Sequence, residues 1–242
     1  MILRLEFVAE ENIELPKSYN HILQGFFYKN MPKIISHFIH DVGFAYGKRR
    51  FRLFTFSKVI GKLLKKAQGK VVYEPKITLY FASPFAQVVS SSAHVFIKKE
   101  SFFLDSNKLY LASVEAINPP ISTTIKVRCL SPITVYKTPI GEKRFVYLSP
   151  WEEEFYRIIK QNLLKKYEIV YNKSYDGVLE IKPVELKKSY KKKVVYKGTL
   201  IVAWEGYYEL SASQEMLKLA LEAGLGARNS QGFGMVEVVS HA

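Results

Sequence analysis

The stretch Gly224-Leu-Gly-Ala-Arg-Asn-Ser-Gln-Gly-Phe-Gly234 near the C-terminus decides how the rest of the chain is interpreted. Two Gly-hydrophobic-Gly pairs flank a polar centre, and their glycines are Gly224, Gly226, Gly232 and Gly234. Glycine adopts positive φ without steric cost and lets another backbone approach closely. Several such positions can turn N–H groups toward one anion, so we expect a phosphate-binding nest to which Arg228, Asn229 and Ser230 contribute charge and hydrogen bonds.

The surroundings of this stretch separate it from the common nucleotide-binding loops. A helical pattern, 214–223, precedes it and a strand pattern, 233–239, follows it, whereas a dinucleotide-binding loop follows a strand and opens a helix. The lysine of a Walker motif is also missing. The alternative is a helix C-cap with a tight turn into an edge strand, which explains one of the first two glycines but hardly both pairs.

The stretch resembles the C-terminal glycine-rich signature of the RAMP superfamily of RNA-binding proteins. In that signature, Gly-hydrophobic-Gly, five residues with at least one Lys or Arg, and a second Gly-hydrophobic-Gly close the chain, and the match here is complete. The N-terminal residues described below narrow the resemblance to the endoribonucleases that process CRISPR repeat RNA.

Composition is that of a basic globular protein. The chain has 242 residues, 48% of them hydrophobic, and a formal net charge of +14. A polyanion, an anionic membrane surface or a basic structural role each accounts for this charge. No apolar run approaches the ~20 residues of a membrane span, no signal peptide is visible, and the single cysteine, Cys129, excludes an internal disulfide or a multi-cysteine zinc site. We therefore expect a cytoplasmic protein without a membrane partner.

Hydrophobic periodicity predicts the same order of elements twice. The predicted strands of the first half are 1–8, 53–57, 77–82, 102–104 and 108–117, with helices at 20–30, after Pro32 and at 84–98. Ile34, Ile35, Phe38 and Ile39 are expected to face inward from the second helix. In the second half we predict strands 123–130, 143–148, 178–188, 193–205 and 233–239, and helices 214–223 and one from the capping box Ser149-Pro-Trp-Glu152 to about 167.

Both halves thus read β-α-β-β-α-β, which is typical of a ferredoxin-like unit. The expected fold class is α+β, with two tandem ferredoxin-like domains at 1–118 and 121–242. We expect the domains to meet near Pro119-Pro120, a plausible hinge.

Two basic segments are candidates for binding an anionic partner. No acidic residue occurs from Val42 to Tyr73, a span rich in Lys and Arg, and six of the eleven residues from Lys187 to Lys197 are lysine. The alternatives are a solvated face and a hairpin tip whose lysines prevent edge aggregation. The expected RNA-binding residues in these segments are Arg49, Arg50, Lys187, Lys188, Lys191, Lys192 and Lys193.

RNA cleavage needs no metal or cofactor, because the neighbouring 2′-hydroxyl can be the nucleophile, so we expect neither. One group must remove its proton, another must protonate the 5′-oxygen, and a cation must stabilise the phosphorane. Histidine suits proton transfer because its usual pKa is about 6.5.

Two N-terminal blocks carry the resemblance to the processing endoribonucleases, Tyr19-Asn-His-Ile-Leu-Gln-Gly-Phe-Phe-Tyr28 and Ile39-His40-Asp41 with Leu53-Phe-Thr-Phe-Ser57. By position, the resemblance implies Tyr28 and His40 as two members of a catalytic triad. The third is commonly a lysine before the Phe-Thr segment; here it is Lys48 or Arg52, with Tyr46 or His37 as substitutes for one role. The structural alternatives are a Tyr28 that edges the core and a His40 that caps its helix.

The resemblance implies cleavage of CRISPR precursor RNA within each repeat, leaving 2′,3′-cyclic phosphate and 5′-hydroxyl ends. The expected partner is repeat RNA, and other interference-complex subunits or a second copy of the chain remain open. The alternatives are a catalytically silent repeat-RNA-binding relative, a RAMP subunit of an interference complex, and an unrelated basic RNA-binding protein.

Overall fold

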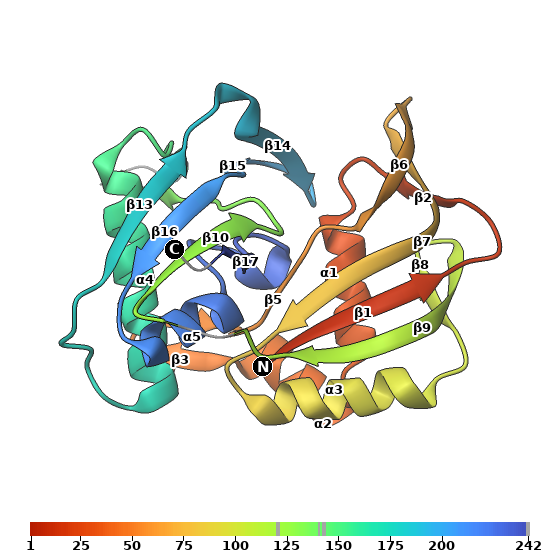
Figure 1. Cartoon of the computed structure of the whole chain (residues 1–242), viewed down its shortest axis with the longest axis horizontal. Helices are drawn as coiled ribbons and strands as arrows, with labels where there is room; N and C mark the ends of the chain where they lie inside the picture. The colour runs from red at the N-terminus through yellow and green to blue at the C-terminus, as the bar shows by residue number, and fades with distance from the viewer. Residues whose placement is uncertain (120–121, 140, 142–143, 241–242) are drawn as a thin grey trace.

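Two antiparallel sheets lie side by side and are joined through a common core (Figure 1). The structure is a computed structural model that describes residues 1–119, 122–139, 141 and 144–240. Of the predicted junction Pro119-Pro120, the second proline therefore lies outside the described residues.

The N-terminal sheet has the strand order β2-β7-β1-β9-β8, with β5 and β6 paired to β7. Its elements are β1 (Ile2–Val8), β2 (Ile13–Pro16), α1 (Asn20–Lys29), β5 (Thr55–Phe56), β6 (Ile60–Ala67), β7 (Lys70–Ala82), α3 (Ala86–Lys98), β8 (Phe102–Leu104) and β9 (Asn107–Ile117). Between α1 and β5 the chain forms α2 (Lys33–His37), the π-helical turn η1 (Phe38–Val42) and the hairpin of β3 (Phe44–Tyr46) and β4 (Arg49–Phe51). When β2, β6 and β8 are left out, the four remaining strands have the order β5-β7-β1-β9.

The C-terminal sheet has the equivalent order β13-β16-β10-β17. Its elements are β10 (Thr124–Cys129), α4 (Glu153–Tyr171), β13 (Glu180–Glu185), β16 (Tyr207–Ser211), α5 (Gln214–Ala223) and β17 (Val236–Ser240). Added to it are β11 (Tyr136–Lys137), β12 (Val146–Tyr147), η2 (Lys188–Tyr190), β14 (Lys191–Tyr196), β15 (Thr199–Trp204) and η3 (Asn229–Gln231). The two matching orders confirm the predicted tandem ferredoxin-like fold.

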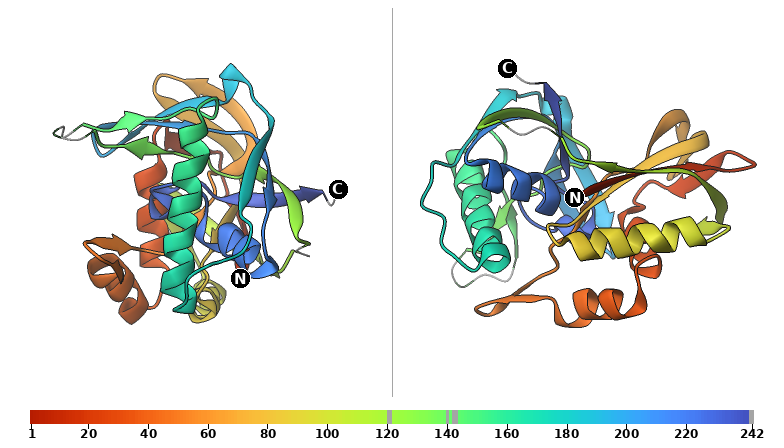
Figure 2. Two further views of the ribbon diagram at one scale, coloured as in Figure 1. Left: turned by 90° about the vertical axis from the view of Figure 1, so that its left-hand side faces the viewer. Right: turned by 60° about the horizontal axis from the view of Figure 1, so that its bottom comes forward.

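Alternating strand residues build the two cores. In the N-terminal half, Phe7 of β1 packs against Phe26 of α1 and Phe96 of α3, with ring centroids 5.6 and 6.1 Å apart. Burying side chains of this size contributes about 1.5–3 kcal/mol each. The C-terminal core also contains Leu53 and Ala82 from the first half, so the two sheets share apolar contacts. Figure 2 shows α5 beside the N-terminus, where Glu222 binds the Met1 ammonium group.

The second helix differs from its prediction. It ends at His37, and the chain continues as a π-helical turn, so the side chains no longer follow the 3.6-residue period. Ile39 is buried, but Ile34 is 85% exposed and Phe38 is 41% exposed. The expectation that all these side chains face inward was wrong for Ile34 and Phe38.

The predicted strand 193–205 is instead a hairpin of β14 and β15 that turns at Lys197 and Gly198, both at positive φ. The lysines from Lys187 to Lys193 therefore lie before and along β14 rather than at a hairpin tip. The sequence pattern did not predict β16 as a separate strand. The predicted capping box is only half formed: Glu152 Oε1 accepts the Ser149 N–H at 2.6 Å, but the Ser149 hydroxyl donates to the same carboxylate rather than accepting a backbone N–H, and the N-cap of the helix is Glu152. The helix after it, α4, continues past the predicted end to Tyr171.

The glycines of the C-terminal loop are required by close packing. All four have positive φ, from 68° to 84°. A Cβ at Gly234 would overlap the Leu225 carbonyl oxygen, and one at Gly232 would lie 2.7 Å from the Phe56 ring of β5. The loop can therefore fold on itself and pack on the N-terminal sheet only because these side chains are absent.

We predict that Gly234→Ala lowers the free energy of unfolding by at least about 3 kcal/mol, because left-handed strain and overpacking add. Gly198→Ala is the matched control, since its φ is +79° but nothing lies within 4 Å of the added Cβ. It should cost about 1 kcal/mol. Urea denaturation measures both, and equal losses would show that close approach is not the reason for glycine at 234.

Candidate active site

One face of α1 connects the glycine-rich loop to Tyr28. Asn20, Gln24 and Tyr28 are spaced four residues apart, so they lie on the same face of the helix. Asn20 Nδ2 donates to the carbonyls of Gln231 and Gly232 at 3.1 Å, and Gln24 Nε2 donates to the Ser230 carbonyl at 2.7 Å. Tyr28 lies about 6 Å further along the axis. Tyr28 therefore lies one helical turn beyond the residues of α1 that hold the loop.

Tyr28 and His40 are in contact. Their ring centroids are 5.2 Å apart and the rings meet edge to face at 83°. Tyr28 also packs against Phe54 at 5.3 Å, which fixes the phenol ring from the core side. His40 belongs to the π-helical turn η1, and its side chain is 66% exposed. The pair thus combines a half-buried phenol with an imidazole that is open to solvent.

Asp41 orients the imidazole of His40. Its two carboxylate oxygens lie 2.6 Å from His40 Nδ1 and 2.7 Å from His37 Nδ1. The hydrogen bond from His40, followed by the positive charges nearby, lowers the pKa of Asp41. The carboxylate is therefore ionised at neutral pH and accepts a hydrogen bond from Nδ1–H, which leaves Nε2 of His40 for proton transfer. His37 is engaged by the same carboxylate.

Arg52 joins this pair, whereas Lys48 does not. Nη2 of Arg52 donates to the His40 carbonyl at 2.9 Å. Burial raises the pKa of Tyr28 to about 12, and the positive charge of Arg52 opposes that rise. Lys48 lies in the turn of the β3–β4 hairpin, roughly 10 Å along the strand from Arg52. Tyr46, on the same hairpin, donates to Glu168 at 3.0 Å.

A basic cleft of about 720 Å³ lies between the two halves. Its cations come from four places, namely Arg49, Arg50 and Arg52 on the β4 side, Lys137 on β11, Lys165 and the buried Lys166 on α4, and Arg228 on the loop. No carboxylate occurs among the described residues that line it. Low-dielectric walls that carry charge of one sign concentrate the potential, so the cleft suits a polyanion.

The polar centre of the glycine-rich loop lines this cleft through Arg228, Asn229 and Ser230, while the glycines are buried. The N–H groups of Gly224, Gly232 and Gly234 donate to the carbonyls of Ala220, Asn229 and Pro132. These three glycines are therefore not donors of the predicted phosphate nest; they shape the loop. Arg228, Asn229 and Ser230, which lie between the glycine pairs, remain the candidates for phosphate contact.

Arg228 lies over two aromatic rings that pack against each other with their centroids 4.5 Å apart. Its guanidinium carbon is 5.2 Å from the Tyr136 ring centroid and 5.3 Å from that of Phe145, and Nη1 donates to Gln231 at 3.1 Å. Cation–π contacts of this kind are worth about 0.5–2 kcal/mol. Arg228 itself has positive φ, 58°. Its place in the cleft is thus set by the loop and by the β11–β12 hairpin together.

The lysine-rich segment lies outside the described lining of the cleft. Lys187 pairs with Glu185 at 2.6 Å, Lys192 pairs with Glu205 at 3.1 Å, and Lys191 lies 5.5 Å above the Trp204 ring. Lys188 and Lys193 belong to η2 and β14.

Part of the basic run in the first half is also neutralised. Lys58 binds Glu205, Lys62 binds Glu74 and Lys70 binds Glu14, although no acidic residue lies between Val42 and Tyr73. The inference that this whole run lacks counter-charges was wrong, because pairing across the fold is invisible in a local window. The arginines at 49, 50 and 52 are the part of the run that lines the cleft.

Sequence reasoning missed several residues of the site. Asp41 was quoted only as the neighbour of His40. Tyr136, Phe145 and Lys165 carried no signal, because they lie far from the glycine-rich loop in the chain and only the fold brings them to it.

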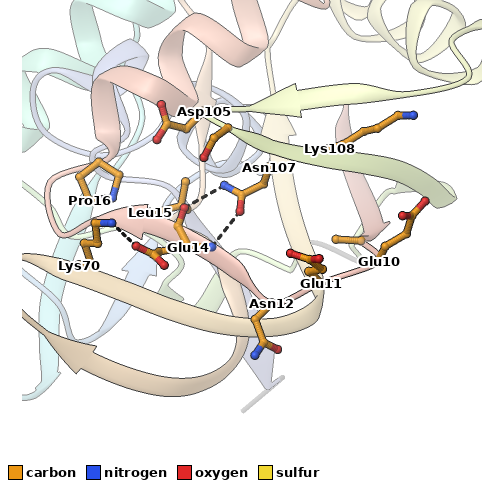
Figure 3. Close-up of a pocket in the computed structure, with 12 residues that line it drawn as sticks. Glu10, Glu11, Asn12, Glu14, Leu15, Pro16, Lys70, Asp105, Asn107 and Lys108 are labelled. Atoms are coloured by element: carbon orange, nitrogen blue, oxygen red, sulfur yellow. Dashed lines mark hydrogen bonds and ion pairs between the residues drawn. The ribbon is translucent and has the colours of Figure 1, made fainter.

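A second concavity, of about 700 Å³, lies at the far end of the N-terminal sheet (Figure 3). Glu10, Glu11, Glu14 and Asp105 line it, and Lys70 pairs with Glu14. Asn107 holds the β2 backbone there through both hydrogen bonds to Glu14. Its acidic lining makes it unsuited to a polyanion.

Two kinds of structure are absent from the described part of the chain. No helix there has the length and apolarity to cross a bilayer. No group of three or more His, Cys, Asp or Glu residues is placed to hold a metal ion in the same residues.

Comparison with known proteins gives a consistent result. The family model "CRISPR associated protein Cas6, C-terminal" matches residues 116–238. The chain is 26% identical to "CRISPR-associated endoribonuclease Cas6 1" of Methanocaldococcus jannaschii, over 98% of this chain and 92% of the relative. It is also 26% identical to "CRISPR-associated endoribonuclease Cas6" of Pyrococcus furiosus, over 93% of this chain and 84% of the relative.

Solved structures share the fold. One described as "An RAMP protein binding different RNA substrates" superposes with a TM-score of 0.83 at 20% identity, covering 99% of this chain and all of the other. Both ferredoxin-like units are therefore found in known proteins in the same arrangement.

Proposed function

This chain belongs to the CRISPR associated protein Cas6 family, and from that premise we propose that it is an endoribonuclease that cuts CRISPR precursor RNA within its repeats. The observation that carries the proposal is the Tyr28–His40 contact at 5.2 Å, with Arg52 beside it at the edge of a basic cleft. The curated relatives named as endoribonucleases support the same activity. The cleft supplies the phosphate-binding surface, and the pair supplies the proton transfers.

The proposed reaction uses the RNA's own 2′-hydroxyl as the nucleophile. His40 Nε2 takes its proton, because Asp41 holds Nδ1 as a donor and so leaves Nε2 free to accept. The 2′-oxygen then bonds to phosphorus, and the bond from phosphorus to the 5′-oxygen breaks. The products are a 2′,3′-cyclic phosphate and a 5′-hydroxyl.

Tyr28 is the proposed acid for the leaving oxygen. Since its pKa is raised to about 12, mainly by burial, the phenol is protonated at neutral pH and can donate to the 5′-oxygen. Arg52 is placed to stabilise the additional negative charge of the phosphorane. The proposal needs no metal ion, and cleavage of a labelled repeat RNA in excess EDTA tests that point.

His40→Ala should reduce the cleavage rate by at least about 100-fold, because it removes the base, while binding of repeat RNA changes little. Single-turnover cleavage and fluorescence anisotropy measure the two effects. Cleavage at the parental rate would remove His40 from the mechanism.

A substrate with sulfur in place of the 5′-bridging oxygen separates the two proton transfers. A thiolate leaves without a general acid, so Tyr28→Phe should be slow on the oxygen substrate and close to the parental rate on the sulfur substrate. His40→Ala should stay slow on both. If the sulfur substrate instead restored the cleavage rate of His40→Ala, His40 would be the acid and Tyr28 the base.

Arg52→Ala should lower the single-turnover rate by about 100-fold, since it removes the positive charge beside the pair. Lys48→Ala deletes a cation on the neighbouring hairpin and serves as the matched control; its rate should stay within about threefold of the parent, because the turn lies roughly 10 Å away. The opposite ranking would assign the charge stabiliser to Lys48.

Phosphate contacts are counted by the salt dependence of RNA binding. Arg228→Ala and Arg50→Ala should each weaken binding and lower the slope of log K against log salt by about 0.7–0.9. The same change at Lys187 should have a smaller effect, because Lys187 pairs with Glu185 and does not line the cleft. Unchanged slopes for both arginines would place the RNA elsewhere.

A further inference from the structure

Lys166 is a buried lysine at the edge of the cleft. It belongs to α4, is only 2% exposed, and its neighbour Lys165 lines the cleft. Lysine is almost never buried to this extent unless its ammonium group is paired. Burial lowers the pKa of Lys166 to about 7, which shows how strongly the site opposes the charge. The hydrogen bonds of the Lys166 ammonium group must therefore offset the cost of burying it.

The ammonium group of Lys166 contacts only oxygens of the glycine-rich loop and its start. Nζ donates to the carbonyls of Ala223 at 3.1 Å and Gly224 at 2.6 Å, and to Asn229 Oδ1 at 2.7 Å. Three N–H donors thus meet three acceptors, two of them at the C-terminal end of α5, where a positive charge is favourable. No carboxylate pairs with Lys166 among the residues that the structure describes.

Asn229 extends this contact to both glycine pairs. Its Nδ2 donates to the Leu225 carbonyl at 2.9 Å, inside the first pair, and to the Phe233 carbonyl at 3.0 Å, inside the second. The neighbours of Asn229 on either side are Arg228 and Ser230, which line the cleft. Lys166 and Asn229 therefore hold together the two ends of the segment that carries these cleft residues.

We propose that Lys166 is a positioning residue for RNA binding, which acts through Asn229 to hold the loop in the shape that presents Arg228 and Ser230 to the RNA backbone. Lys166 itself makes no phosphate contact, because its donors are used inside the protein. This inference rests on the proposed function for the identity of the ligand, and it assigns a role to a residue that takes no part in the chemistry.

Two adjacent lysines provide a matched test. Lys166→Met and Lys165→Met each replace the amino group of one lysine on the same turn of α4 by an apolar side chain. With a fluorescein-labelled single-stranded CRISPR repeat RNA, we expect Lys166→Met to weaken binding at least about tenfold with an unchanged salt slope. Lys165→Met should instead lower the slope by about 0.7–0.9, as expected for a lost phosphate contact. Parental affinity for Lys166→Met, or a slope that falls as it does for Lys165→Met, would overturn the proposal.

Asn229→Ala keeps the proposal testable if Lys166→Met fails to fold. It should weaken binding in the same way, and the double variant should bind no more weakly than the worse single variant, because both changes break one connection. Additive losses would show that the two residues act independently. Hydrogen exchange of amides 224–234 should become faster in each variant, and unchanged exchange would contradict the proposal. Exchange is measured without RNA, so it separates failure of this inference from failure of the proposed function.

Discussion

The close approach of backbone to backbone in the glycine-rich loop is the constraint on which the site depends. A side chain at Gly234 would overlap the Leu225 carbonyl, and one at Gly232 would press on Phe56 of the other half. Because neither is present, the loop closes on itself and packs against β5 and α1. Asn20 and Gln24 then bind its carbonyls, which brings the loop and Tyr28 onto one face of one helix. In the proposed function, this packing couples RNA binding at the loop to the chemistry at Tyr28.

Charge is distributed in two different ways over this basic protein. Many lysines are paired with carboxylates, some of them distant in sequence, as in Lys58–Glu205, and others close to it, as in Lys187–Glu185. Surface pairs of this kind add little stability, typically about 0–1 kcal/mol, but they lower the local potential. The cleft between the halves has cations and, among its described lining, no carboxylates. We therefore expect the net charge of +14 to attract a polyanion generally, and the cations of the cleft to determine where it binds.

Much of the fold was predictable because its helices and strands follow local patterns of apolar and turn residues. The helix 214–223 and the hairpin 102–104 with 108–117 match α5, β8 and β9 closely, since their apolar periods are clear and their ends carry turn residues. The errors fall where local signals are weak. The π-helical turn after His37 breaks the helical period without a proline or glycine, and the Lys197–Gly198 turn is short enough to leave the pattern of one long strand.

By itself, the sequence determined the two repeated units and the glycine-rich loop, because each follows from a local period or a motif of adjacent residues, while the candidates Tyr28 and His40 came from the resemblance of two N-terminal blocks to a known family. Only the tertiary structure shows that Arg52 donates to the His40 carbonyl while Lys48 lies in the β3–β4 turn, which is why Arg52 is the proposed charge stabiliser. It also shows that the N–H groups of Gly224, Gly232 and Gly234 are bound inside the protein, and that Lys166, in the sequence one lysine among many, holds the loop. Contacts between residues far apart in the chain depend on distance in space, and no local pattern records that distance.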